Sequence, residues 1–217
     1  ISRYVENGEI LVFETRYNSD EIFEKKRKEL ETGGRNAKAP EMRLVPYLMI
    51  DAKYVGPEKK TREVKTLWSL IDGEMVLNTD NWERTRGFHD ALVADASSGE
   101  FRVINALAAQ GGISTLEKIS KELKLEEEVV KPWIESLREK HLVVLRGNDL
   151  VLHVQDPKMT VTPETKVNRF LVTQPYSFGE RITRRYSASK IEKMAQAAFG
   201  NDFTVKSTRE VFLPIYS

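Results

Sequence analysis

Residues 98–154 read SGEFRVINALAAQGGISTLEKISKELKLEEEVVKPWIESLREKHLVVLRGNDLVLHV, and this stretch decides the fold. Apolar residues recur at helical spacing in three consecutive segments, which predicts three amphipathic helices. Two short apolar runs on either side of residues 146–149 (RGND) then predict a β-hairpin. The expected inward-facing residues of the three helices are Phe101, Ile104, Leu107 and Ala108; Leu116, Ile119 and Leu123; and Val129, Val130, Trp133, Ile134 and Leu137.

The ends of these helices carry their own signals. Gly111-Gly112 ends the first helix, and Ser114-x-x-Glu117 predicts a capping box at the start of the second. A short turn at Lys124-Leu125 separates the second helix from the third. Three helices with a tight turn and a terminal hairpin resemble the winged helix-turn-helix family, which implies a DNA-binding or protein-binding domain.

Charge leaves the partner of this domain open. In the winged-helix family the third helix enters the major groove, but here it begins with Glu126-Glu127-Glu128. These carboxylates also suit a helix N-terminus, where they interact with the helix dipole. DNA and a protein therefore remain equal alternatives. The residues that would contact DNA are Lys118, Lys121, Lys131, Arg138 and Arg146.

The segments on either side predict two similar β-α-β modules. The first has strands at residues 10–16 and 43–54, a helix at 21–30 whose Ile22, Phe23 and Leu30 face a core, and a hairpin at Asp72-Gly73. The second has strand-like residues at 181–185, a helix at 187–199, and strands at 203–206 and 210–216. Pro157, Pro163 and Pro175 mark a linker before it.

The two modules share landmarks that favour an internal duplication. Residues 17–22 (YNSDEI) parallel 186–191 (YSASKI), an offset of 169, and Pro46 parallels Pro214, an offset of 168. The competing interpretation is that any two strand-helix-strand segments align this well. We expect an α+β fold with a central winged helix-turn-helix flanked by two related β-α-β modules. The expected domains are residues 1–80, a linker at 81–97, residues 98–156, and a shortened second copy at 157–217.

Residues 44–51 (LVPYLMID) and 68–75 (WSLIDGEM) resemble modules appended to archaeal ATPases of the HerA/FtsK type. The shared pattern is LPYY followed by VDxxTGE. Here Val45 replaces the Leu, Leu48 replaces the second Tyr, and no Thr precedes Gly73. The resemblance implies a DNA-translocating motor outside this chain, with the present residues serving as a loading or docking region.

The positive charge is concentrated near the C-terminus. Residues 157–217 carry 10 Lys and Arg against five acidic residues, a net charge of +5, whereas residues 1–95 and 96–156 are each at −2. Within this region, the stretch from Tyr176 to Tyr186 combines Phe178 with three further candidate DNA contacts. Its alternative interpretation is a charged strand edge that resists aggregation. The three candidate DNA contacts in this stretch are Arg181, Arg184 and Arg185.

The sequence carries no recognisable catalytic or metal-binding motif. Cysteine is absent, and His89, His141 and His153 lack metal-ligand spacing. Asp72 and Glu74 flank Gly73 as ordinary turn residues, and there is no P-loop motif. We therefore expect no enzyme activity, no cofactor and no metal. Six aromatic residues could stack on bases but are more simply explained as core: Trp68, Trp82, Trp133, Tyr47, Tyr54 and Phe88.

No apolar run approaches the ~18–20 residues of a membrane span, and no signal peptide is recognisable. We expect a cytoplasmic piece of a longer protein, because residue 1 is not Met and the last strand is cut short. The leading functional hypothesis is a DNA-engaging or docking region of an ATPase-linked protein. The alternatives are a homo-oligomeric transcription regulator with ligand-sensing or dimerising modules, and a protein-protein interaction scaffold.

Overall fold

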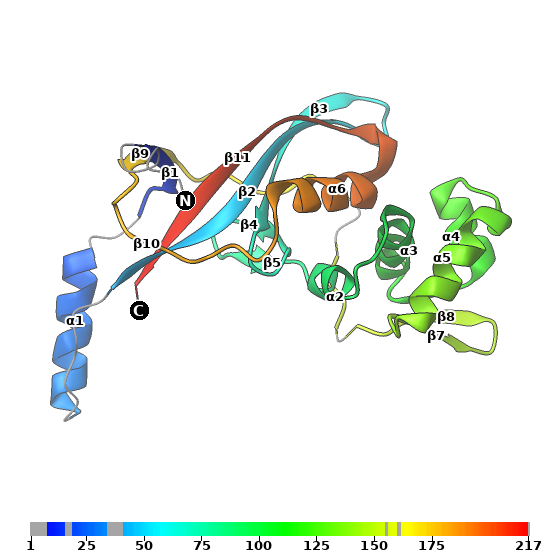
Figure 1. Cartoon of the computed structure of the whole chain (residues 1–217), viewed down its shortest axis with the longest axis horizontal. Helices are drawn as coiled ribbons and strands as arrows, with labels where there is room; N and C mark the ends of the chain where they lie inside the picture. Colours follow the sequence, from blue (N-terminus) through cyan, green and yellow to red (C-terminus); the bar gives the residue numbers. More distant parts are fainter. Residues whose placement is uncertain (1–7, 16–18, 34–40, 155, 160–161, 217) are drawn as a thin grey trace. The chain divides into compact units, whose positions relative to one another are not determined.

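The computed structural model describes residues 8–15, 19–33, 41–154, 156–159 and 162–216. Helices and strands contribute nearly equal shares, 34% and 35%, which confirms the α+β class. The chain forms two compact units: residues 1–47, 169–184 and 210–217 make the first, and residues 48–168 and 185–209 make the second. Each unit draws on both ends of the chain, whereas the sequence predicts consecutive domains. Figure 1 gives the positions of the elements along the sequence.

The first unit is built around a small sheet with the strand order β9-β1-β11-β2-β10. β1 runs antiparallel to β9 and parallel to β11, while β10 runs parallel to β2. β2 and β11 are long strands, and only the start of β2 and the end of β11 belong to this unit. The bounds are β1 Glu9–Phe13, β2 Met42–Val55, β9 Leu171–Pro175, β10 Glu180–Arg181 and β11 Phe203–Tyr216.

Alternation along the strands gives this first unit its core. Ile10 and Val12 of β1 are buried together with Leu44 of β2 and Phe212 of β11. Side chains two residues apart on a strand share one face, so this face of the sheet is apolar. Half-buried apolar residues pack against the cluster: Met42, Val172, Tyr176 and Phe178.

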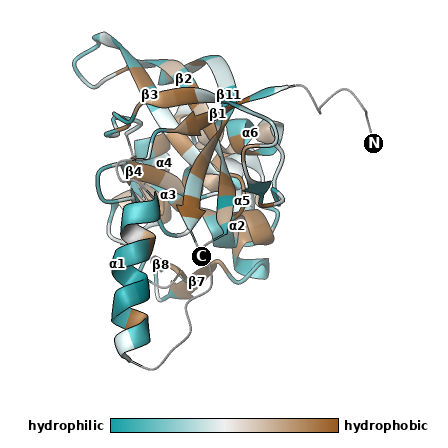
Figure 2. Ribbon diagram, turned by 90° about the vertical axis from the view of Figure 1, so that its left-hand side faces the viewer, coloured by the Kyte–Doolittle hydropathy of each residue, from teal (hydrophilic) through white to brown (hydrophobic). Residues whose placement is uncertain are grey.

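The sequence predicts a buried face for helix α1 (Ser19–Thr32), and the structure does not show one. Leu30 is 38% exposed and Phe23 is half-buried, so the expected core face is wrong for both. The side chain of Ile22 lies outside the described residues. The physical reason is that this helix has too few apolar residues to form a continuous stripe, and Figure 2 shows it as mostly hydrophilic.

In the second unit the strand order is β5-β4-β3-β2-β11. β3 and β4 pair antiparallel, and Ser69 and Glu74 close the turn between them by a backbone hydrogen bond, so the hairpin at Asp72-Gly73 is confirmed. The two C-terminal strands expected at 203–206 and 210–216 are one continuous strand, β11. The new bounds are β3 Thr61–Ser69, β4 Met75–Asn78 and β5 Glu83–Arg84.

The core of this unit is continuous from the sheet to the helices. Trp68 is fully buried, with the Phe88 ring centroid 5.2 Å away and the Phe199 centroid 6.0 Å away, both edge-on. These aromatic residues are therefore unavailable for stacking on bases. Phe88 opens α2 (Phe88–Val93), which occupies part of the stretch expected to be a linker, and Phe199 ends α6 (Ala188–Phe199), which packs on α3. A 3₁₀ turn, η1 (Gly200–Asp202), leads from α6 into β11.

The three helices and the hairpin expected in the middle of the chain are present. Ile119, Val130 and Leu137 are fully buried between the helices. A three-stranded sheet with the order β6-β8-β7 completes this region. The bounds are α3 Ser98–Ala109, β6 Ile113–Ser114, α4 Leu116–Leu123, α5 Glu127–Glu139, β7 Val143–Arg146 and β8 Asp149–Leu152.

Two sequence predictions for this region are wrong. The capping residue of α4 is Thr115, whose side chain accepts a hydrogen bond from the Lys118 N–H, because Ser114 is already in β6 and bonded to Gln110. Val129 is 46% exposed instead of inward. It lies about 100° around the helix from Val130, which takes the buried position.

Candidate functional site

The exposed cations of α4 and α5 lie opposite the buried apolar stripes of these helices, and α4 is also capped by Thr115. Lys118 and Lys121 lie on the solvent side of α4, opposite buried Ile119. Lys131 and Arg138 lie on the exposed side of α5, opposite Val130, Ile134 and Leu137. In the part of the chain that the structure describes, none of these four cations forms a salt bridge.

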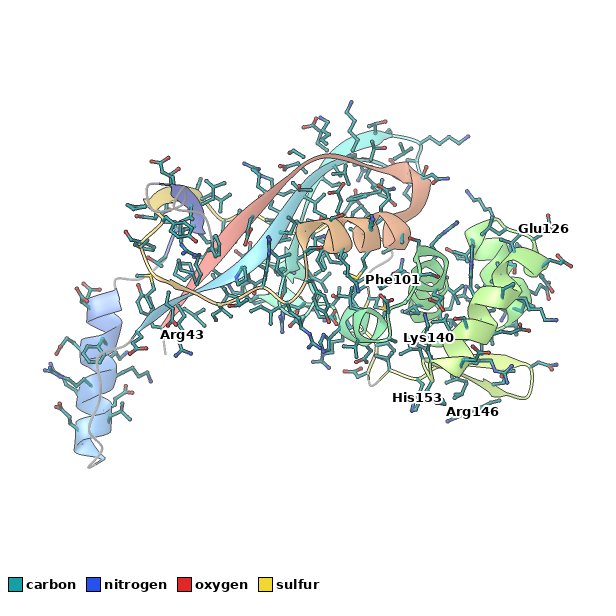
Figure 3. The ribbon with its side chains drawn as sticks, in the orientation of Figure 1. Arg43, Phe101, Glu126, Lys140, Arg146 and His153 are labelled. Carbon is teal, nitrogen blue, oxygen red and sulfur yellow. The ribbon has the colours of Figure 1, made fainter. Side chains whose placement is uncertain are left out.

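The exposed side of α5 carries more acid than base. Its acidic residues outnumber the two basic ones, and a further exposed glutamate, Glu126, occupies the N-cap position without a side-chain capping bond. Figure 3 labels Glu126 and Lys140, which mark the two ends of this helix. Phosphate groups would meet a net negative helix here, so α5 is poorly suited to the major groove. The acidic residues are Glu127, Glu128, Glu135 and Glu139.

The hairpin β7–β8 presents one basic residue at its tip. Arg146 and Asp149 face each other across the turn and are both exposed. On the same face of the sheet, Val144 and Ile113 stand on either side of Val151, and Ile113 is 53% exposed. The hairpin thus offers a partly apolar surface with one charge of each sign.

A buried ion pair secures the start of α3. Ser97 caps the helix, and the Glu100 carboxylate accepts a hydrogen bond from the Ser97 N–H, so the capping box of this region lies here and not at Ser114. Glu100 is 2% exposed, and its Oε2 lies 2.8 Å from the Lys140 ammonium at the end of α5. Lys140 also donates to the Asp95 carbonyl. Three segments are therefore tied together at one point.

This pair sets the protonation of Glu100. Burial acts to raise the pKa of the Glu100 carboxyl. Hydrogen bonds from Lys140, Ser136 and the backbone of Ser97 outweigh burial and bring that pKa below its ordinary value. The sequence pattern Ser97-Ser98-Gly99-Glu100 is a capping-box signal, but only the structure shows that Lys140 completes it.

Glu74, the acidic residue of the Asp72-Gly73-Glu74 turn, has a structural role. Its carboxylate is 7% exposed and accepts hydrogen bonds from the N–H groups of Gly87 and His89 at the start of α2 and from the Thr85 hydroxyl. A carboxylate at a helix N-terminus is stabilised by the unpaired N–H groups and the helix dipole. Asp72 forms an ion pair with Arg84 at 2.8 Å. Both carboxylates therefore have partners within the fold.

The rings of His89 and His153 each contact a backbone carbonyl. The His89 ring contacts the Asp72 carbonyl, and the His153 ring contacts the His141 carbonyl at 3.2 Å. Across the described ranges, no group of three His, Asp or Glu side chains is placed to hold a metal ion.

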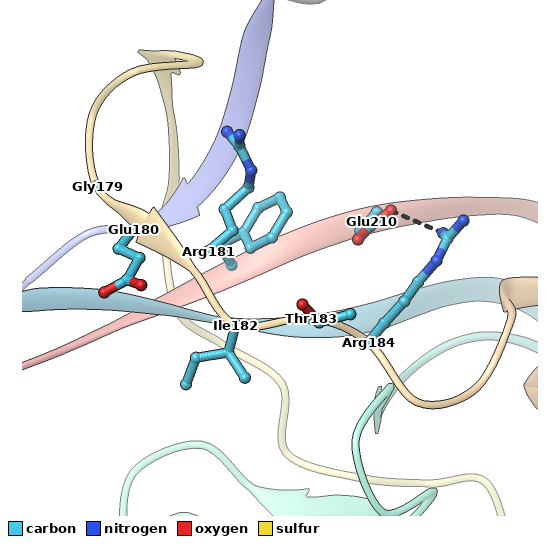
Figure 4. Close-up of a pocket in the computed structure, with 8 residues that line it drawn as sticks. Gly179, Glu180, Arg181, Ile182, Thr183, Arg184 and Glu210 are labelled. Carbon is cyan, nitrogen blue, oxygen red and sulfur yellow. Dashed lines mark hydrogen bonds and ion pairs between the residues drawn. The ribbon is translucent and has the colours of Figure 1, made fainter. Parts of the chain in front are cut away.

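The C-terminal arginines are engaged with neighbouring groups. In the first unit, Arg181 lies over the Tyr176 ring at 3.1 Å from its centroid and donates to the Tyr176 carbonyl. Arg184 pairs with Glu210 at 3.3 Å (Figure 4). These residues line a hollow of about 490 Å³, the others being Gly179, Glu180, Ile182, Thr183 and Phe212.

Arg185 belongs to the second unit and is exposed, and its backbone N–H is bonded to the Leu70 carbonyl. The predicted DNA contacts are thus divided between the units: Arg181 and Arg184 belong to the first, and the other six belong to the second. Their contact with DNA stays a prediction.

Comparison with known proteins adds no further assignment. No protein-family model, curated protein or solved structure matches the chain. None of the helices in the described ranges combines the length and apolar character needed to cross a membrane.

Proposed function

We propose that the chain is a non-catalytic docking region of a larger DNA-processing protein, in which a winged helix-turn-helix domain, residues 98–156, engages a partner protein. The observation that carries this proposal is the exposed acidic side of α5 within a winged-helix order of elements. The resemblance of residues 44–51 and 68–75 to modules of HerA/FtsK-type ATPases supports the larger context.

The order of elements supports the winged-helix assignment. Helix, short strand, helix, helix and hairpin follow one another as α3, β6, α4, α5, β7 and β8. The short strand β6 joins the hairpin in one sheet. Winged helices share this arrangement, and they serve both DNA and protein contacts, so the fold alone does not choose between them.

Electrostatics favours the protein partner. A duplex-binding helix must bring cations to the phosphates, and α5 exposes four glutamates against Lys131 and Arg138. The lysines of α4 favour a second candidate, DNA bound beside α4, because Lys118 and Lys121 are exposed and free of salt bridges in the described structure.

A fluorescence-anisotropy titration with duplex and single-stranded DNA across a salt series tests the proposal. We expect no salt-sensitive binding by the native chain. The variant Glu127→Lys/Glu128→Lys/Glu135→Lys should gain it, because the reversal removes the repulsion at α5. Steep salt dependence in the native chain that disappears in Lys118→Gln/Lys121→Gln would overturn the proposal in favour of DNA.

We also propose that the flanking modules arose by duplication, and the strand register supports this. An offset of 169 carries Val12 of β1 onto Arg181 of β10, and an offset of 168 carries Leu44 of β2 onto Phe212 of β11. The parallel pair Val12↔Phe212 therefore corresponds to Arg181↔Leu44, which is itself a parallel pair of the sheet. The adjoining pair behaves in the same way, with Leu11↔Val211 corresponding to Glu180↔Arg43.

The helices support the same correspondence. α1 begins at Ser19 and α6 at Ala188, which differ by 169 residues. The offsets come from matching residues in the sequence, and the backbone pairing of β1 with β11 and of β10 with β2 was not used to choose them.

A transcription regulator with dimerising modules remains the alternative. It predicts a stable two-fold dimer and a palindromic binding site, whereas the docking region needs neither. Sedimentation of the chain together with the DNA titration distinguishes the two.

A further inference from the structure

The two edges of β1 are both occupied in the first unit. One edge pairs with β11, and the other pairs with β9 in an antiparallel ladder from Glu9↔Pro175 to Phe13↔Leu171. The ladder continues one residue further, where the Glu14 N–H donates to the Phe170 carbonyl at 3.0 Å. Pro175 lies opposite Glu9, a position where no N–H is needed, because hydrogen-bonded pairs alternate along the ladder.

By the proposed duplication, on which this inference rests, β10 is the counterpart of β1 and Thr183 is the counterpart of Glu14. The Ile182 N–H donates to the Leu44 carbonyl of β2. The backbone groups of Arg181 and Thr183 therefore point to the opposite edge, because successive residues of a strand face alternate sides. Among the described residues, the Thr183 N–H has no acceptor.

The surroundings of this edge are open. Residues 179–184 line the hollow of about 490 Å³ drawn in Figure 4. The Glu180 side chain is 72% exposed and Thr183 is exposed. An unpaired strand edge of this kind is a template for a further strand.

We propose that the edge of residues 179–183 binds an extended segment of a partner protein as an added antiparallel strand. Main-chain hydrogen bonds to Arg181 and Thr183 hold the segment, and cross-strand neighbours select its side chains. The counterpart strand β9 places Leu171 opposite Phe13, so an apolar residue fits opposite Ile182. A basic residue fits opposite Glu180, two positions further along the partner strand, where it would share the carboxylate with Arg43, whose Nε lies 3.7 Å from Glu180 Oε2.

The probe is a labelled peptide with the β9 sequence, residues 170–176 (FLVTQPY), titrated into the full chain by fluorescence anisotropy. A second peptide carries Thr173→Lys, which sets a lysine opposite Glu180. We expect the lysine peptide to bind about two- to fivefold more tightly, the range of a cross-strand ion pair. The Glu180→Gln protein should lose this advantage.

The Glu180→Gln protein also locates the peptide. A peptide that displaced β9 from β1 would lie against Leu11 instead, and the Glu180 substitution would then change nothing. A third peptide with Val172→Pro loses the N–H that faces Arg181, and we expect about a tenfold loss of affinity. Circular dichroism of the Glu180→Gln protein confirms that it is folded.

A Glu180→Gln protein that keeps the preference for the lysine peptide would overturn the proposal, and so would any of three further results. The first is that neither the β9 peptide nor the lysine peptide binds. The second is that the proline peptide binds as tightly as the β9 peptide. The third is a tenfold gain of affinity in a chain without residues 1–7, which would mean that the chain itself fills the edge. The DNA titration concerns α4 and α5, so its outcome and the peptide outcome are independent.

Discussion

α1 and α6 begin at corresponding positions of the proposed repeat, yet they have opposite relations to the core. α6 buries an apolar face made by Ile191, Met194, Ala195, Ala198 and Phe199. At four of the corresponding positions α1 has Lys25, Lys26, Glu29 and Leu30, and these are exposed. The comparison shows that helix formation and helix burial are separate properties of a sequence. Local signals start both helices, but only a continuous apolar stripe attaches a helix to a core.

The largest expected effect comes from comparing two matched alanine substitutions, one in α6 and one in α1. Phe199→Ala removes a ring that contacts Trp68, and we expect a loss of about 3–5 kcal/mol in the free energy of unfolding. Leu30→Ala, at the corresponding position of α1, should cost less than about 1 kcal/mol. Urea unfolding measures both. Equal losses would mean that α1 is also part of a core.

The next test concerns the region that receives α6. Lys140→Met leaves Glu100 buried without its cation, and we expect a loss of about 3 kcal/mol, measured by urea unfolding. α3, which carries Glu100, packs against α6. In the Lys140→Met protein the packing of α6 should therefore contribute less to stability, and the contrast between α6 and α1 should become smaller. Lys131→Met, at an exposed position of α5, is the control and should have little effect.

The same ion pair predicts a dependence on pH. The pKa of Glu100 is lowered in the folded chain, so its contribution to stability is present above the unfolded pKa of about 4.3 and is lost as the pH falls through the folded value. Glu100→Gln should be less stable than the native chain at pH 7. Thermal unfolding between pH 7 and pH 3 should show the difference between the two proteins shrinking towards acid. A difference that stays constant would rule out this role.

A smaller loss is expected for Asn105→Ala. The Asn105 amide donates to the Ala198 carbonyl at 2.7 Å and joins α3 directly to α6. Its removal should cost about 1–3 kcal/mol, because the carbonyl is left without that donor in a buried place. Urea unfolding measures the loss, and hydrogen exchange of α6 should rise more than that of α1.

The smallest expected effect lies at the start of α6. The Ser187 side chain accepts a hydrogen bond from the Lys190 N–H at 3.2 Å. Ser187→Ala should lower the free energy of unfolding by about 1 kcal/mol. Ser189→Ala, two residues later and also exposed, should lower it by about half as much or less. The melting temperatures of the two variants measure the difference, and equal values would mean that Ser187 does not stabilise α6 as a cap.

The sequence predicts well what depends on neighbouring residues. The stripe of Ile119, Val130 and Leu137 and the hairpin at Asp72-Gly73 lie where periodicity and turn chemistry place them. The predicted cap at Ser114 is wrong because this serine is part of the two-residue strand β6. Helical periodicity also gave no reason to separate Val129 from Val130, since either could have faced the core.

What the sequence could not predict depends on distant pairing. No local signal joins β1 to β11 or β10 to β2, so the discontinuous units were not anticipated. Lys140 completes the capping box of a helix 40 residues earlier, and Arg184 pairs with Glu210. A charge count identifies such residues as candidates for DNA contact, but it does not show whether their charges are already paired. The DNA contacts and the protein partner stay predictions for the same reason.

The pairing of Leu11 with Val211 has a consequence for synthesis. About 200 residues separate the two strands, so at 5–20 residues per second β1 waits for roughly 10–40 s before β11 leaves the ribosome. Its other partner, β9, also comes late. The helices α4 and α5 and the hairpin β7–β8 need no such delay, because they pack on one another and on α3, whereas the contact of α3 with α6 also forms late. During translation α4, α5 and the hairpin can thus pack on α3 first, while β1 lacks both of its strand partners until β9 and β11 have been made.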